Sequence, residues 1–181
     1  MKKILGLLGI VLLMAGCDLS AMTNTPTKQV EIFLNKYQTL DNGVLSDLDN
    51  VIADEDYLTE EQRDKYRDIM KKHYQNLTYN IKDEVIDGDI ATVTVEIEVT
   101  DYSKIMTDAN TYLEQNPSEF NDVSGAYDAV KFVDYRLDKL EDVKGTVKYT
   151  LDLTLNKIDD KWQLNPLNPT DQDKINGMYT Y

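Results

Sequence analysis

Residues 90–100 read IATVTVEIEVT, and this stretch decides the fold. Apolar residues at every second position alternate with threonine and glutamate, which is the period of a β-strand with one buried face and one face in water. Residues 77–86 precede it, and the turn Asp87-Gly88-Asp89 joins the two segments. The apolar positions of this earlier segment are Leu77, Tyr79, Ile81 and Val85. The pattern therefore predicts an antiparallel hairpin with one apolar face.

A second hairpin follows later in the chain, over residues 146–164. Asp159-Asp160 forms its turn, after which Trp162 and Leu164 return along the first strand. The apolar positions of the longer strand are Val147, Tyr149, Leu151, Leu153 and Leu155. An isolated hairpin is marginal in water, so we expect the two hairpins to join into one four-stranded sheet packed against helices.

Three helices are predicted before the sheet. Thr25-Pro26 is a helix start, because threonine caps well and proline is tolerated at the first helical position. A second helix is predicted over residues 44–52. Thr59 with Gln62 matches the capping box of a third. These helices would cover the apolar face of the sheet.

A helical insertion, Ser103 to Asp142, separates the two hairpins, with a loop expected over residues 116–125. A short helical tail after Pro169 carries Ile175 and Met178. Helices grouped apart from antiparallel strands indicate the α+β class.

The N-terminus has the pattern of a secretory signal peptide. A basic start, Met1-Lys2-Lys3, precedes an apolar run over residues 4–15, and Gly16-Cys17 ends it. The run is about twelve residues long, whereas a spanning helix needs roughly 20. Residues 1–16 are therefore predicted to be a signal peptide.

Residues 13–17, LMAGC, resemble the bacterial lipobox. The resemblance implies cleavage after Gly16 and a diacylglyceryl group on the sulfur of Cys17, which becomes the mature N-terminus. Met14 stands where this motif usually has leucine. The alternative is an ordinary signal peptide with a coincidental cysteine. Two acyl chains give stable anchoring where one is marginal. Residues 17–25 would then be the acylated cysteine and a short spacer.

Charge limits the partners of the domain. The 181 residues include 33 acidic and 19 basic side chains, for a net charge of −14. Such a chain lacks the clustered cations needed to bind nucleic acid or anionic lipid. Cys17 is the only cysteine, so no disulfide supports the fold once it is acylated. Membrane attachment is therefore expected through the lipid on Cys17, at the outer face of the plasma membrane.

Three segments resemble the NTF2-like (cystatin-like) fold, in which a curved sheet wraps an N-terminal helix to form a cone. They are TPTKQVEIFLNKY (25–37), residues 76–102 and residues 145–164. The resemblance implies one such domain over residues 26–181, of the kind found in small lipoproteins of Gram-positive bacteria with uncharacterised function. The insertion is longer than the minimal fold has. The fold hosts enzymes, binding modules and scaffolds, so it implies no function.

Few residues suggest catalysis. His73 is the only histidine and lies on the apolar stripe of the third predicted helix, which favours a packed side chain over a base. With one histidine and one cysteine, the chain lacks the residues that the usual nucleophilic systems and zinc sites need. Asp101, Asp134 and Tyr135 are candidates by position only, for an acid or base at the open end of a cone.

Two acidic groups invite comparison with calcium loops. The first holds Asp47, Asp49, Asp54, Glu55 and Asp56, and the second is Asp171-Gln172-Asp173. Neither places a glutamate at the twelfth position, so turns and helix caps are the favoured interpretation. No metal and no cofactor are predicted.

Three functions remain open on the sequence. The favoured one is a membrane-anchored binding or interaction module of unknown ligand. The alternatives are a structural or stress-related envelope protein without a defined ligand, and an enzyme that uses an NTF2-like cavity.

Overall fold

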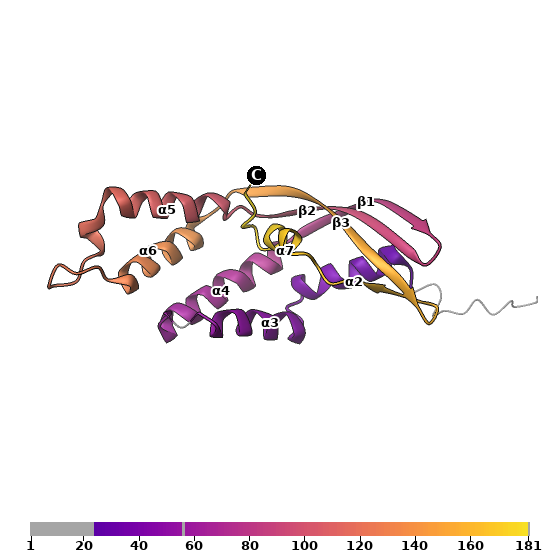
Figure 1. Cartoon of the computed structure of the whole chain (residues 1–181), viewed down its shortest axis with the longest axis horizontal. Coiled ribbons are helices and arrows are strands. Elements are labelled where there is room, and N and C mark those ends of the chain that lie inside the picture. The colour runs from indigo at the N-terminus through magenta and orange to yellow at the C-terminus, as the bar shows by residue number, and fades with distance from the viewer. Residues whose placement is uncertain (1–23, 56, 181) are drawn as a thin grey trace, which may run out of the picture.

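The computed structural model describes residues 24–55 and 57–180, which form an α+β fold in the predicted element order (Figure 1). The helices before the sheet are α2 (Pro26–Gln38), α3 (Asn42–Ala53) and α4 (Glu60–Asn76). The strands are β1 (Thr78–Asp87), β2 (Ile90–Thr100), β3 (Thr146–Ile158) and β4 (Lys161–Leu164). The insertion holds α5 (Ser103–Gln115), the 3-10 helix η1 (Pro117–Phe120) and α6 (Ala129–Asp142), and the tail holds α7 (Pro169–Ile175).

The two predicted hairpins join into one antiparallel sheet of order β1-β2-β3-β4. In the register of the two central strands, Val93 lies opposite Leu153 and Val95 opposite Leu151. These four side chains are at most 2% exposed. The other face is polar, and Glu96 there forms ion pairs with Lys82 (β1) and Lys148 (β3). The alternation in the sequence thus gives one buried and one wet face, as predicted.

Helix α2 covers the apolar face of the sheet. Its buried Val30 and Leu34 belong to the same core cluster as the inward residues of β2 and β3. The predicted caps are present, because Thr25 accepts a hydrogen bond from the amide of Lys28, and Thr59 and Gln62 form the full capping box of α4. Local sequence therefore sets where these helices begin.

The first hairpin departs from the predicted alternation near its turn. The register shifts between Ile81 and Asp83, where β1 carries a bulge. A one-residue slip moves the following side chains to the other face of a strand. Val85 therefore lies opposite Thr92 on the wet side and is 58% exposed, so its predicted place on the apolar face is wrong.

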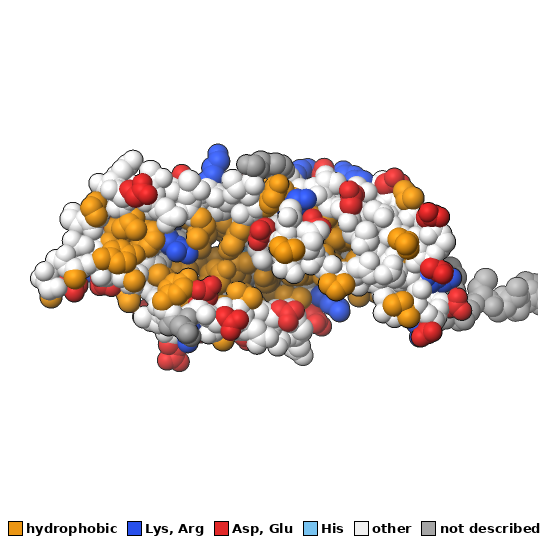
Figure 2. Space-filling model, viewed as in Figure 1, with side chains coloured by type: hydrophobic (Ala, Val, Ile, Leu, Met, Phe, Trp, Pro, Cys, Tyr) orange, Lys and Arg blue, Asp and Glu red, His pale blue; other side chains and the backbone are white. Residues whose placement is uncertain are grey.

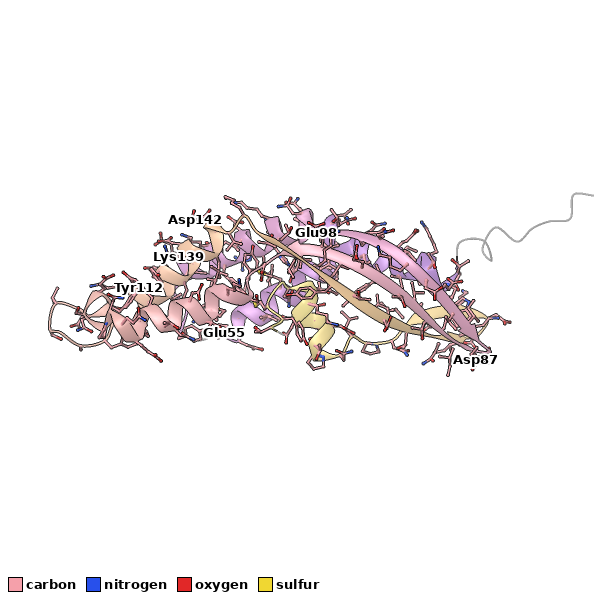
Figure 3. The ribbon with its side chains drawn as sticks, turned by 90° about the horizontal axis from the view of Figure 1, so that it is seen from above. Glu55, Asp87, Glu98, Tyr112, Lys139 and Asp142 are labelled. Carbon is pink, nitrogen blue, oxygen red and sulfur yellow. The ribbon has the colours of Figure 1, made fainter. Side chains whose placement is uncertain are left out.

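The insertion forms an arm that projects from the end of the sheet opposite the two hairpin turns. Asp87 of the first turn and Tyr112 of α5 lie toward opposite ends of the molecule (Figure 3). The arm has its own small core of Ala109, Phe120 and Phe132. Phe120 belongs to η1, within the segment predicted to be a loop.

The C-terminal tail is locked against α4 and the end of β2. The Nε2 atom of His73 donates a hydrogen bond to the carbonyl oxygen of Ile175, at 2.7 Å. The amide of Tyr102 donates to the carbonyl of Gly177, at 2.8 Å. Gly177 has φ +69°, and a Cβ there would overlap the carbonyl oxygen of Thr100. His73 is 1% exposed, which agrees with the packed histidine expected from the sequence.

The stability of the fold should depend on pH through His73. Burial lowers the pKa of this imidazole from 6.5 to about 4, and its bond to Ile175 only partly offsets this. Because a carbonyl oxygen can only accept, Nε2 holds the proton and Nδ1 has no partner among the described residues. The folded state therefore prefers the neutral ring, and the unfolded chain binds a proton first as pH falls.

We expect the free energy of unfolding to be constant above pH 6.5 and to fall by about 3 kcal/mol between pH 6.5 and pH 4. Urea titrations at several pH values measure it. The range from pH 6.5 to 5 isolates the histidine, because ordinary carboxylates titrate lower. His73→Gln keeps an N–H donor but cannot titrate, so its stability should be flat over that range. An equal slope in this variant would contradict the assignment.

Gly177→Ala should lower the free energy of unfolding by about 3–4 kcal/mol, because it adds a steric overlap to the strain of a positive φ. Gly88→Ala is the matched control. Gly88 has φ +60° but open space around a Cβ, so it should cost only about 1–2 kcal/mol. Urea denaturation of both variants gives the comparison. Equal losses would show that the contact with Thr100 is not what requires glycine.

Candidate functional site

A cavity of about 440 Å³ lies where α2, α3, α4 and the C-terminal tail meet. Figure 2 shows a hollow lined by hydrophobic side chains in the middle of this face, beside α7 and above α3 as placed in Figure 1. The volume is within the range of small-molecule pockets, roughly 300–1,000 Å³. We call it the tyrosine cavity. Its lining residues are Phe33, Tyr37, Val44, Asp47, Leu48, Asn50, Val51, Tyr66, Met70, Tyr74, Leu167, Gln172 and Asn176.

Helix α4 supplies one wall of the tyrosine cavity through residues at a spacing of four. Tyr66, Met70 and Tyr74 fall on one helical face and all line the cavity. The Tyr74 ring packs edge-on against Tyr37 of α2, with ring centroids 5.1 Å apart, and Tyr37 packs edge-on against Phe33. Edge-to-face contacts of this kind fix ring positions. The aromatic wall is therefore preformed.

The tail supplies the opposite wall. Gln172 and Asn176 line the cavity, and the hydroxyl of Tyr74 donates to Oδ1 of Asn176 at 3.0 Å. Burial raises the pKa of Tyr74, so this hydroxyl stays protonated at neutral pH. The wall also depends on the lock between His73 and Ile175, because Ile175 ends α7 next to Asn176.

Among the described residues of the lining, helix α3 contributes the only charged side chain. Asp47 lies on this helix with Leu48 and Val51, and its carboxylate has no hydrogen bond or ion pair within the described part of the chain. No lysine, arginine or histidine is among the lining residues in the described part of the chain. The cavity thus combines aromatic rings, neutral amides and a single negative charge.

A second cavity, of about 320 Å³, adjoins the first at Tyr66, which lines both. It lies between α4, α6 and the tail, and its apolar lining includes Met106 and Met178. Among the described residues of its lining, Arg136 is the one cation and Glu55 the one carboxylate. The Nε atom of Arg136 is buried without a partner among the described residues.

His73 lines a third cavity, of about 350 Å³, together with Lys72, Lys144 and Glu141. The Nδ1 atom of His73 has no hydrogen-bond partner among the described residues, but burial lowers the pKa of the ring to about 4, so it is a weak base at neutral pH. Glu141 is within ion-pair distance of Lys65 and Lys72 on α4. The burial of His73, its bond to Ile175 and its lowered pKa indicate a structural role.

The structure separates the three candidates for acid–base chemistry. Asp101 accepts hydrogen bonds from the amide and hydroxyl of Ser103 at the start of α5. Asp134 accepts one from Gln62 of α4, at 2.7 Å. Tyr135 stacks on Tyr112 of α5, with ring centroids 5.0 Å apart. Each therefore has its own local partner, and the three do not converge on one site.

The residues of the two acidic groups also contact different partners. Asp49 accepts from Nε of Arg67 at 2.7 Å, while Asp54 is the C-cap of α3. Asp171 exchanges hydrogen bonds with Asn168 at the start of α7. Asp56 lies outside the described residues. Over residues 24–55 and 57–180, no three His, Cys, Asp or Glu side chains are grouped so as to hold a metal ion.

Phe33 and Tyr37 are spaced along α2 and Tyr66 lies on α4, but no pattern in the sequence predicts a cavity between them. One signal was present: the chain has twelve tyrosines against three phenylalanines. Tyrosine at core-facing positions brings a hydroxyl that needs a partner or solvent. Asp47, considered only as part of an acidic group, belongs to this site instead.

Comparisons with known proteins leave the family open. No protein-family model and no curated protein sequence matches the chain. Among solved structures, one similar protein is YcdA of Bacillus subtilis subsp. subtilis str. 168, which is described provisionally as a lipoprotein. The TM-score is 0.45 and the sequence identity is 18%. The alignment covers 90% of this chain and 55% of that one, so this chain spans about half its length. A likeness at this level shows neither family nor function.

Cys17 and the predicted signal peptide lie outside the described residues, so the lipid attachment stays a prediction. Within the described part of the chain, each helix is too short or too polar to cross a membrane.

Proposed function

We propose that the chain is a lipid-anchored, extracytoplasmic binding module whose ligand site is the tyrosine cavity. The observation that carries the proposal is the cavity itself, a preformed aromatic space of about 440 Å³ with a few convergent polar groups. Pockets of this composition are typical small-ligand sites. The lipobox resemblance at residues 13–17 supports the anchor, and the position of α2 against the bent sheet supports an NTF2-like domain.

The anchor would also orient the domain. Asn24 is fixed to the sheet by two hydrogen bonds with the backbone of Trp162 on β4. Only six residues separate it from Cys17, a reach of roughly 20–25 Å including the flanking bonds. The end of the sheet with the hairpin turns would therefore lie near the membrane, and the α5–α6 arm would point away from it.

Cys17→Ser should release the protein from membranes, because the serine hydroxyl cannot serve as the thiolate nucleophile in acylation. Fractionation of cells that express the wild type and the variant, with immunoblotting, measures it. The wild type should be found with membranes and the variant in the soluble or secreted fraction. A variant that stays with the membrane would show a second attachment and contradict the anchor.

Small aromatic probes should bind the tyrosine cavity. Three probes share one ring and differ in charge: benzyl alcohol, benzylammonium and phenylacetate. Full-length protein with 13C-labelled methionine methyl groups, in non-ionic detergent micelles, should show a saturable shift of the Met70 signal with at least one of them. Met70 lines the cavity, and Met106, in the adjoining cavity, is an internal reference.

Val51→Trp, at a 55% exposed position in the lining, should fill part of the opening and weaken binding by about ten-fold. Ile32→Trp is the matched control, since Ile32 is 40% exposed on α2 outside the lining. If no probe shifts Met70, or if both variants behave alike, the cavity is not a ligand site.

A further inference from the structure

The charges around the tyrosine cavity are all of one sign. Of the lining residues that the structure describes, Asp47 is the only acidic one, and none is basic. The chain as a whole carries a net charge of −14. An anionic ligand would enter this site against both charges, whereas a cation would be attracted by both. Charge complementarity therefore favours cationic over anionic ligands at this site.

Asp47 is available to a ligand. Its carboxylate has no hydrogen bond or ion pair with any described residue, although the neighbouring Asp49 on the same helix is paired with Arg67. The part of α3 that lines the cavity thus carries one carboxylate without a positively charged partner among the described residues. Asp47 is exposed, and its carboxylate beside the aromatic rings can accept charge-assisted hydrogen bonds from an ammonium group.

The field of Asp47 reaches the aromatic wall. The pKa of Tyr37 is raised, first by burial and then by the negative charge of Asp47, and that charge also contributes to the raised pKa of Tyr74. Asp47 on α3 therefore lies near hydroxyls carried by α2 and α4. A ligand between them would contact the carboxylate and the rings together.

The rings suit the same class of ligand. Four aromatic side chains, Phe33, Tyr37, Tyr66 and Tyr74, line the cavity. Aromatic faces attract cations, and organic ammonium groups surrounded by several rings are the best example. The hydroxyls of Tyr37 and Tyr66 form no hydrogen bond with another described residue, so their oxygens can accept from an N–H group.

We propose that the tyrosine cavity binds a small organic ammonium ion, with Asp47 as its counter-ion and the tyrosine rings around its apolar part. This inference rests on the proposed function, because it names the ligand class of the same site. It also assigns roles: Asp47 determines the sign of the ligand charge, and the rings of α2 and α4 determine its size.

The test uses the same three probes. Benzylammonium should bind about ten-fold more tightly than benzyl alcohol, and phenylacetate should bind least. The affinity for benzylammonium should fall as salt is raised from 20 to 500 mM (~Debye lengths of 20 Å to under 5 Å), whereas that for benzyl alcohol should not. Dissociation constants come from the Met70 shift, with empty micelles as the blank.

Asp47→Asn should weaken benzylammonium binding by about five- to ten-fold and change benzyl alcohol binding by less than about two-fold. Asp142→Asn is the control. It removes the same charge at the end of α6, from a residue outside the cavity lining (Figure 3). This variant should leave both affinities unchanged.

The outcomes separate the two proposals. If benzyl alcohol binds as tightly as benzylammonium, or if Asp47→Asn affects both probes alike, the ammonium inference is overturned and the binding site stands. If phenylacetate binds best, Asp47 does not determine the sign of the ligand charge, and the ammonium inference is overturned. If no probe binds at all, the proposed function and the inference both fail.

Discussion

The pairing of β2 with β3 is the constraint on which the rest of the structure depends. Val93, Val95 and Ile97 alternate with polar residues along β2, and each lies opposite an apolar residue of β3. This register places an apolar surface on one side of the sheet only, so α2 must lie on that side. Helix α2 in turn contacts α3 and α4, and α4 also contacts β2. The tyrosine cavity lies where these three helices do not close fully.

The tail completes the cavity and depends on a contact that is distant in sequence. His73 on α4 holds Ile175 at the end of α7, and Gly177 lets the backbone pass close to Thr100 at the end of β2. Both contacts bring Asn176 to the hydroxyl of Tyr74. The buried histidine therefore affects the site by holding the tail in position.

Local features were predictable from the sequence, and features that depend on packing were not. The strands, the turns at Gly88 and Asp159, and the cap at Thr59 were correct because each is determined by neighbouring residues. The bulge in β1 was missed, since nothing in residues 81–83 breaks the alternation strongly enough to mark it. The cavity was missed because its walls come from α2, α3, α4 and the tail, whose relative positions no local pattern encodes. The NTF2-like cone and the role of Cys17 remain predictions.

The charge of the chain also bears on how such a site would work at a membrane. The whole chain carries a net charge of −14, so a domain that a lipid on Cys17 held near an anionic bilayer would be repelled by that surface. That repulsion would keep the domain off the lipid, while the acidic surface of the domain itself would attract cations within a Debye length, about 8–10 Å at physiological salt. Asp47, an exposed carboxylate beside the aromatic cavity, would then sample a local cation concentration above that of bulk solvent. The acidic composition, which on its own indicates only solubility, becomes part of the physical argument for a cationic ligand.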